Sequence, residues 1–278
     1  MFVGRKAVLA TMHQKERAIA PILEPALGMQ IVVPQGFNTD EFGTFTRDVE
    51  RKGDQRQTAR QKAIAAMNWM GADLAIASEG SFVPHPVLPI LPCNRELVML
   101  IDRANGLEIV GEVISTETNF ASRSVSCFEE AKAFALKVGF PDHGLIARAN
   151  PNSTQLIKGI TTLEELKESI EKLLEPTLET IYLETDMRAM YNPTRMRIIA
   201  QATQDLLQKI NRLCPRCSTP GFEVAELKRG LPCNFCQTPT MLVFSHRYQC
   251  QKCGFAEEIF YPQGARSADP SHCPSCNP

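Results

Sequence analysis

Short apolar runs alternate with amphipathic stretches along the first 175 residues of the chain. Apolar residues recur at helical spacing over 58–70, and three other stretches have a similar pattern. The predicted helices are 15–27, 58–70, 128–138 and 162–174. The short apolar runs that predict strands are 6–11, 29–34, 74–78, 97–102, 107–115 and 144–148. This alternation predicts an α/β fold, with a mixed sheet flanked by helices.

Turn and breaker residues refine this pattern. Asn105-Gly106 lies between two apolar runs and predicts a tight turn, so that 97–115 forms a long hairpin. Pro21 and Pro25 are expected to break the first predicted helix. The proline-rich segment 84–92 is excluded from any central strand, because proline cannot donate to a strand ladder.

The chain is predicted to have three parts. Thr162 and Glu165 have the spacing of a capping box at the start of the last helix of the first part, and Pro176 follows that helix. A further helix over 200–212 leads into a cysteine-rich tail. The predicted parts are an α/β domain over 1–175, a helical connector over 176–212 and tandem four-cysteine zinc ribbons over 213–278.

Eight of the ten cysteines form four Cys-x-x-Cys pairs near the end of the chain. These pairs are Cys214 with Cys217, Cys233 with Cys236, Cys250 with Cys253, and Cys273 with Cys276. Two such pairs suit one four-thiolate zinc ion, so we expect two structural zinc ions. The residues between the pairs favour sequential pairing, in which the first two pairs share one zinc and the last two pairs share the other. Interleaved pairing, as in cross-brace modules, is the alternative.

Charge and composition narrow the classes of function. Thirty basic residues oppose 31 acidic ones, and 44% of the 278 residues are hydrophobic, as in a globular protein without a strong overall field. Thiolates on zinc would make the tail net acidic, so nucleic acid is not an expected partner, whereas a protein partner fits the ribbons. No apolar run is long enough to cross a membrane, and the N-terminus lacks the pattern of a secretory signal. We therefore expect a cytoplasmic protein.

Polar residues that follow predicted strands are the candidate ligand-binding residues, because ligands bind there in α/β sheets. Thr11, His13 and Lys15 lie at the first strand-to-helix turn and suit an anion such as phosphate. A solvated helix start is the alternative. Glu79, with Ser81 near it, follows a later strand and suits Mg²⁺. A turn residue that caps local amides is the alternative for Glu79.

Two further segments carry candidate residues. The segment 38–48 continues to Lys62 and mixes hydroxyls, carboxylates and cations, as a nucleotide or metal site does. A solvated loop and helix face fits that mixture equally well. Arg188, Arg195 and Arg197 can clamp phosphate or pair with acidic residues.

The whole chain resembles an uncharacterised bacterial family, a domain of unknown function. The segments that carry the resemblance are 10–16, 43–46, 58–63, 76–82 and 186–189. This resemblance implies no activity.

Residues 5–175 resemble the inosine-triphosphate pyrophosphatase-like superfamily, whose enzymes hydrolyse non-standard nucleoside triphosphates with Mg²⁺. The matching positions are Thr11, Lys15, Ala59, Lys62, Ala63, Glu79 to Ser81, the hairpin 97–115 and the turn 139–142. The resemblance implies a nucleotide-binding hydrolase with Lys15 and Glu79 in catalysis, and with Thr11, His13, Ser81 and Lys62 in substrate binding. Gln57 stands where those enzymes carry a Glu, so a carboxylate among Asp40, Asp48, Glu50 and Asp54 would have to assist the metal.

Two functions from different classes follow. One is a nucleotide-binding protein with a structural zinc-binding tail, and more specifically an enzyme that hydrolyses nucleotides with Mg²⁺. The other is a non-catalytic zinc-ribbon module that contacts a protein. Clustering of Lys15, Glu79 and a carboxylate from 40–54 around one pocket would favour the first.

Overall fold

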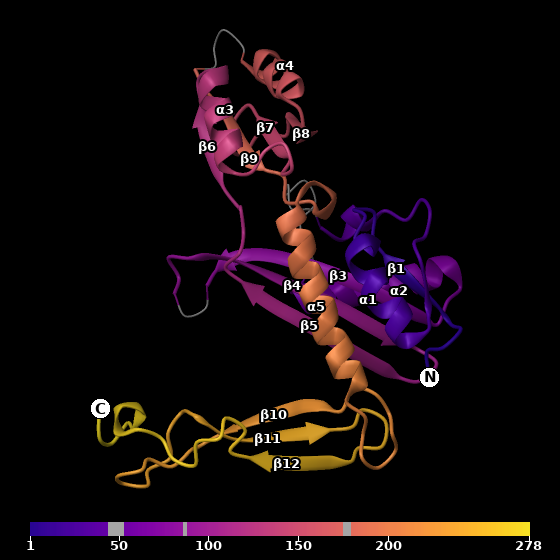
Figure 1. The fold of residues 1–278 in the computed structure, drawn as a ribbon, viewed down its shortest axis with the longest axis vertical. Helices are drawn as coiled ribbons and strands as arrows, with labels where there is room; N and C mark the ends of the chain where they lie inside the picture. Colours follow the sequence, from indigo (N-terminus) through magenta and orange to yellow (C-terminus); the bar gives the residue numbers. More distant parts are fainter. Residues whose placement is uncertain (44–52, 86–87, 175–178) are drawn as a thin grey trace. The chain divides into compact units, whose positions relative to one another are not determined.

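The structure is a computed structural model that describes residues 1–43, 53–85, 88–174 and 179–278. The chain forms two compact units, and its elements are labelled in Figure 1. The first unit contains Met1–Ala104 and Val110–Leu207, and the second contains Asn105–Ile109 and Gln208–Pro278. The second unit therefore holds all eight paired cysteines.

A five-stranded mixed sheet lies at the centre of the first unit, in the strand order β2-β1-β3-β4-β5. β1 runs parallel to β2 and β3, and β4 runs antiparallel to β3. The strands are β1 (Lys6–Ala10), β2 (Gln30–Val32), β3 (Leu74–Pro84), β4 (Pro92–Asp102) and β5 (Leu107–Ser115). The mixed α/β fold class predicted from the sequence is confirmed.

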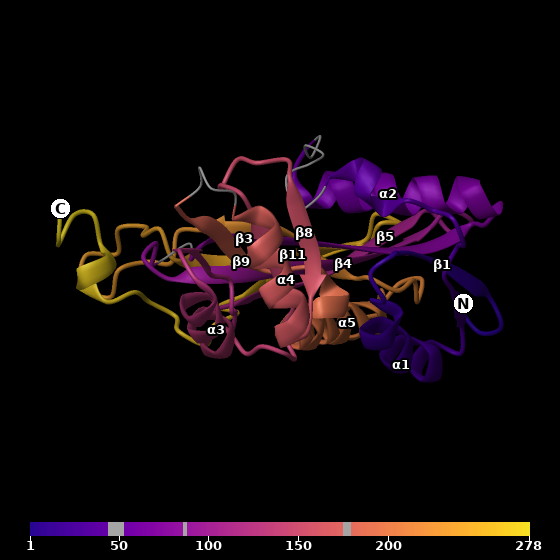
Figure 2. The same ribbon diagram turned by 90° about the horizontal axis from the view of Figure 1, so that it is seen from above.

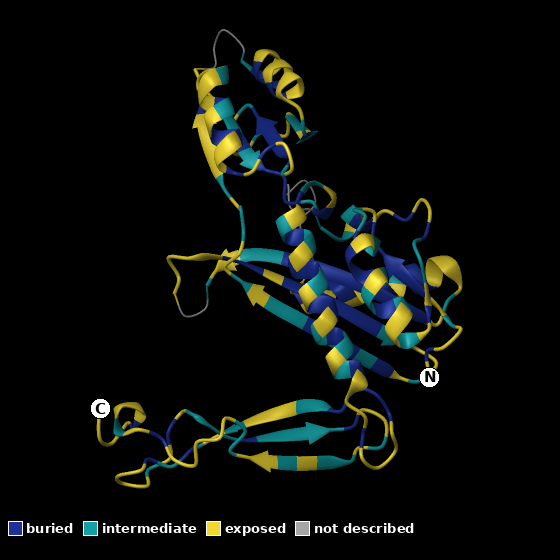
Figure 3. Ribbon diagram, viewed as in Figure 1, coloured by how far each residue is buried: buried dark blue, intermediate teal, exposed yellow. Residues whose placement is uncertain are grey.

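Helices cover both faces of this sheet, with α2 (Gln55–Met70) on one side and α1 (Glu16–Leu27) and α5 (Pro193–Asn211) on the other, as Figure 2 shows. Small side chains on α2 pack against alternate residues of the strands, so the backbones approach closely. The buried residues of this cluster are Val8, Ala10, Phe37, Ala59, Ala63, Ala66, Met67, Ala75, Ala77, Leu97 and Met99. Figure 3 shows the resulting buried centre of the sheet.

The helix α1 continues through Pro21 and Pro25, so the predicted break is wrong. Both proline rings lie on the exposed side of the helix, where water can bind the carbonyls that lose their partners. Ile19 and Leu23 on the opposite side are fully buried. Packing of this apolar stripe therefore outweighs the low helix propensity of proline.

β3 and β4 form an antiparallel ladder that is longer than the predicted strands. The ladder runs from the pair Leu74–Asp102 to the pair Pro84–Pro92. Backbone pairing continues past the apolar residues because it does not depend on side-chain hydrophobicity. The two prolines lie at the end of the ladder, where a missing N–H is tolerated.

A four-stranded antiparallel sheet in the order β6-β9-β7-β8 also belongs to the first unit. Its strands are β6 (Ser122–Val125), β7 (Leu145–Arg148), β8 (Leu156–Ile160) and β9 (Ile181–Thr185), and its helices are α3 (Phe128–Lys137) and α4 (Leu163–Leu173). The capping box of Thr162 and Glu165 at the start of α4 is confirmed. β9 lies within the segment 176–212 that we expected to be a helical connector.

The second unit contains a three-stranded antiparallel sheet in the order β10-β11-β12. Its strands are β10 (Glu223–Arg229), β11 (Val243–Gln249) and β12 (Ala256–Phe260). Among the residues that the structure describes, no helix has both the length and the apolar character needed to cross a bilayer.

Candidate functional site

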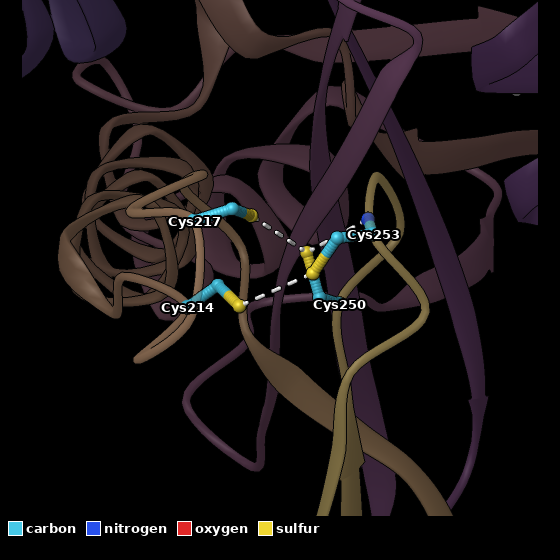
Figure 4. A group of neighbouring side chains, drawn as sticks. All are labelled: Cys214, Cys217, Cys250 and Cys253. Carbon is cyan, nitrogen blue, oxygen red and sulfur yellow. Dashed lines mark hydrogen bonds between the residues drawn. The ribbon is translucent and has the colours of Figure 1, made fainter.

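Eight thiols of the second unit gather into two groups of four, and within each group all sulfur atoms lie within 4.8 Å of one another. One group is Cys214, Cys217, Cys250 and Cys253, and the other is Cys233, Cys236, Cys273 and Cys276. Figure 4 shows the first group, with Cys214 and Cys217 facing Cys250 and Cys253.

The sulfur spacing fits a tetrahedral zinc ion. Distances between facing sulfur atoms are 3.7, 3.6, 3.9 and 3.5 Å. A tetrahedron with Zn–S bonds of about 2.3 Å has edges of about 3.8 Å, whereas a disulfide needs about 2.05 Å. Both groups can therefore hold one metal ion each, and four thiolates leave no position open for a substrate. Such a site supports the fold and carries no chemistry of its own.

Each Cys-x-x-Cys pair lies on the same kind of turn. The residue after the second cysteine donates its N–H to the carbonyl of the first cysteine, as Ser218 does to Cys214 at 2.8 Å and Gln237 does to Cys233 at 3.1 Å. Ser218 and Gln237 have φ of 56° and 61°, in the left-handed region. This turn places both sulfur atoms on one side of the backbone, which is why a short polar sequence is sufficient to build half of a metal site.

Threonines that follow two of the pairs favour the thiolate form of a cysteine. A hydrogen bond joins Cys217 Sγ and Thr219 Oγ1 at 3.2 Å, and an equivalent bond joins Cys236 and Thr238 at 3.2 Å. These hydroxyl groups, with help from the threonine backbone, lower the pKa of Cys217 and of Cys236 to about 6. Since thiolate is the ligand form of cysteine, both turns are prepared for a metal.

The pairing of the cysteines is interleaved, so the predicted sequential pairing is wrong. The first pair joins the third, and the second joins the fourth. The reason is the register of the sheet, in which Glu223 at the start of β10 lies opposite Gln249 at the end of β11. This register brings Cys217 close to Cys250. At the other end, Cys233 bridges to Ala268, which brings the last pair beside the second.

Double cysteine substitutions distinguish the two pairings. Cys214→Ser with Cys250→Ser removes two ligands of the same site, so this variant should retain about one zinc ion per chain. Cys214→Ser with Cys233→Ser damages both sites, so zinc should fall to nearly none. Elemental analysis of protein purified under reducing conditions gives the number of zinc ions per chain. Sequential pairing predicts the opposite order of the two variants.

A second candidate site lies in the first unit, at the carboxyl end of β1 and beside the middle of β3. Glu79 and Ser81 lie within β3 and pair with β4, so the prediction that Glu79 follows its strand is wrong. Lys15 is 6% exposed and its Nζ donates to the carbonyl of Ser78 at 3.3 Å. No carboxylate in the described part of the chain forms an ion pair with Lys15. Burial, and then Arg195 and Lys62, lower its pKa to about 7, against the opposing effects of Glu96 and Glu79. Among the described residues, Lys15 is thus a buried amine without a carboxylate partner of its own.

The members of two buried ion pairs interact electrostatically with Lys15. Lys62 Nζ on α2 donates to Glu79 Oε2 on β3 at 2.6 Å, and Arg195 Nε on α5 donates to Glu96 Oε1 on β4 at 2.6 Å. All four side chains are nearly or fully buried. Between them, Gly80 leaves room for the second pair, since a Cβ there would lie 2.5 Å from Arg195 Nη2 and from Glu96 Oε1.

The pKa of His13 reflects the burial and the positive charges around this site. Its Nε2 lies 3.6 Å from Asp40, yet burial and the cations Lys15, Arg195, Arg188 and Lys62 lower its pKa to about 3. The imidazole is therefore neutral near pH 7. The backbone N–H of His13 donates to Thr11 Oγ1 at 3.2 Å, and α1 begins without a side-chain cap. Ser78 Oγ is buried and has no hydrogen-bond partner within the described segments.

The structure brings most of the predicted site residues together. Near the end of β1 and the middle of β3 lie Thr11, His13, Lys15, Lys62 and Glu79. Ser81 Oγ lies nearby and donates to Gln55 Oε1 at 3.3 Å. Lys15 and Glu79 therefore lie near each other, but neither lines the cavity beside the start of α1, so clustering around one pocket, which would favour the first function, stays a prediction.

The predicted assisting carboxylates are only partly at this site. Asp40 lies beside His13, whereas Asp54 caps α2 together with Gln57. Asp48 and Glu50 lie outside the described residues.

Several residues of this site are not apparent from the sequence. Gln55 is 8% exposed, and its Nε2 donates to the carbonyls of Glu79 at 2.6 Å and Arg95 at 2.8 Å. Glu96 was also missed, although a single carboxylate at the edge of an apolar run was an available signal.

The three arginines considered as phosphate ligands pair with acidic residues. Arg188 binds Asp186 at 2.6 Å, Arg195 binds Glu96 and Arg197 binds Glu117. Their guanidinium groups are thus engaged within the protein.

Comparison with known proteins gives a family without a described activity. No curated protein matches the chain. Neither comparison shows the resemblance to the inosine-triphosphate pyrophosphatase-like superfamily, which stays a prediction. A family model for a domain of unknown function (DUF6671) matches residues 62–278, a range that contains all eight cysteines of the two four-cysteine groups and both buried ion pairs. The chain belongs to this family.

Proposed function

We propose that the carboxyl edge of the five-stranded sheet binds a phosphorylated nucleotide, with Lys15 as the main phosphate ligand. The observation that carries this proposal is the buried ammonium group of Lys15, which has no carboxylate partner among the described residues. A buried charge is costly unless it is paired, and a bound anion would supply the missing partner.

The surroundings of Lys15 suit phosphate oxygens. The uncapped start of α1 favours negative charge, and no residue that the structure describes forms a hydrogen bond with the buried hydroxyl of Ser78. The cations that lower the pKa of His13 produce a positive potential at the same place. Phosphate is therefore favoured over a neutral ligand.

A cavity beside this turn supports a ligand larger than phosphate. Its volume is about 740 Å³, within the range of small-molecule sites. Gln14 and Arg17, which flank the start of α1, form one wall, and Met190 and Met196 contribute apolar surface. Lys15 does not line this cavity, so the proposal requires the phosphate to reach Lys15 from the start of α1 while the apolar ring system contacts the methionines.

Mg²⁺-dependent hydrolysis is a more specific function, and it requires a ligand for the metal ion at this site. Glu79 would have to ligate the metal, whereas in the structure it accepts a hydrogen bond from Lys62. We therefore propose binding as the function and treat hydrolysis as a prediction that requires Glu79 to exchange Lys62 for a metal ion.

Protein contact through the second unit is the other candidate function. Phe235, inside the Cys233–Cys236 turn, is 81% exposed. Leu227 and Ile259 are also exposed and lie opposite His246 on one face of the sheet. Exposed apolar groups of this kind are common at contact surfaces. This function requires no ligand in the first unit.

The proposal is tested with the zinc-loaded full chain and a panel of nucleoside mono-, di- and triphosphates, first by thermal shift and then by isothermal titration calorimetry. Lys15→Met should weaken binding by about tenfold to a hundredfold, because it removes a charged hydrogen-bond donor. The affinity of the wild type should fall as the pH rises above about 7, where Lys15 loses its proton.

Lys6→Met is the matched control, since Lys6 lies at the exposed start of the same strand. It should bind like the wild type. Without ligand, Lys15→Met should be at least as stable as the wild type, because it removes a buried unpaired charge. Absence of binding across the panel would reject the proposal and leave the protein-contact module.

A further inference from the structure

The carboxylates of the Lys15 site are already neutralised by the protein. Glu79 is bound by Lys62 and Glu96 by Arg195, each at 2.6 Å and each away from water. The charges within each of these two pairs cancel. Among these five buried side chains, the ammonium group of Lys15 therefore leaves a net positive charge. Within the described residues, the groups of side chains placed to hold a metal ion are the two cysteine clusters.

A divalent cation would enter this site against that surplus charge. Burial and then Lys15 disfavour a proton on His13, and the Lys15 ammonium group likewise disfavours a second positive ion beside it. A metal ion could reach Glu79 only after displacing a buried hydrogen-bonded ammonium group, which would then be left without its partner. A phosphate anion meets neither obstacle, because no carboxylate among the described residues pairs with Lys15.

We infer that the Lys15 site binds its phosphorylated ligand as the metal-free anion, with Lys62 occupying the place at Glu79 that a divalent cation would take. This inference rests on the proposed function and specifies its ligand class. Lys62 thus acts as the counter-ion of Glu79. Because the protein itself neutralises this carboxylate, an anionic ligand needs no metal ion in order to approach it.

The test is calorimetric titration of the zinc-loaded full chain with inorganic pyrophosphate, and with the tightest nucleotide of the panel. The buffer is freed of Mg²⁺ without a chelator, because a chelator would also withdraw zinc. We expect binding without Mg²⁺, and severalfold weaker binding when Mg²⁺ complexes most of the ligand. Binding that appears only with Mg²⁺ would overturn the inference and leave the proposed function standing. No binding of either ligand, with or without Mg²⁺, would reject the proposed function itself.

Two variants assign the effect to Lys62. Lys62→Met leaves Glu79 without its ammonium partner, so metal-free binding should be lost and Mg²⁺ should restore it. Lys62→Met with Glu79→Gln removes both charges, so this variant should fold and bind without Mg²⁺ within about tenfold of the wild type. If Lys62→Met does not fold, the double variant carries the test. Dependence of its binding on Mg²⁺, or wild-type metal-free binding by folded Lys62→Met, would contradict the inference.

Discussion

Removal of zinc is expected to unfold the second unit and to leave the five-stranded sheet of the first unit folded. The buried core of the second unit includes metal ligands themselves, since Cys214 and Cys250 pack with Phe222. Structural zinc contributes about 10–16 kcal/mol of apparent binding free energy in small zinc modules near neutral pH. No other interaction in this unit has that magnitude.

Hydrogen exchange measured by mass spectrometry after treatment with a chelator shows which strands lose their amide protection without metal. Amide protection should be lost in β10, β11 and β12, and retained in β1, β3 and β4. Return of zinc under reducing conditions is the control and should restore protection. Protection that persists in β10 to β12 after complete loss of metal would contradict a zinc-dependent fold.

Substitution of Arg195 is expected to destabilise the first unit by about 3–5 kcal/mol, the range for breaking a buried ion pair. Arg195 and Glu96 are both fully buried, and Arg195 also donates to the carbonyl of Met187. Arg195→Met would leave the Glu96 carboxylate in a dry environment without its cation. Chemical denaturation, followed by signals from the first unit, measures the loss.

Arg197→Met is the matched control for this variant. Arg197 lies two residues further along α5 and pairs with Glu117, but both side chains are more than half exposed to water. Its loss should cost less than about 1 kcal/mol, as for other exposed pairs. Equal losses from the two variants would show that the Arg195–Glu96 pair is not a buried anchor of the sheet.

Local sequence signals predict local structure well in this chain. The capping box at Thr162 depends on residues three positions apart, and it is confirmed. α5 begins at Pro193 rather than near residue 200, because proline at a first helical position is not a breaker. Pro21 and Pro25 show the limit of such signals, since burial of the opposite side of α1 decides the outcome.

Long-range register explains what the sequence does not reveal. The interleaved cysteine pairing depends on β10 lying antiparallel to β11, and the spacing of Cys-x-x-Cys pairs is compatible with either pairing. Lys15 does follow its strand, whereas Glu79, expected after a strand, lies inside β3, because backbone pairing with β4 continues past the apolar residues. The partner of Glu79 could not be predicted from the sequence. It depends on which face of β3 the carboxylate occupies and on the turn of α2 that carries Lys62.

The most direct test of the proposed site is the titration of Lys15 itself, followed by NMR of protein labelled with ¹³C at lysine and assigned with Lys15→Met. We expect a pKa near 7 without ligand, because burial and neighbouring cations disfavour the ammonium form. Inorganic pyrophosphate should raise this pKa, since a nearby anion favours the charged form. A Lys15 that titrates close to the ordinary value of about 10.4 and does not respond to pyrophosphate would contradict the site.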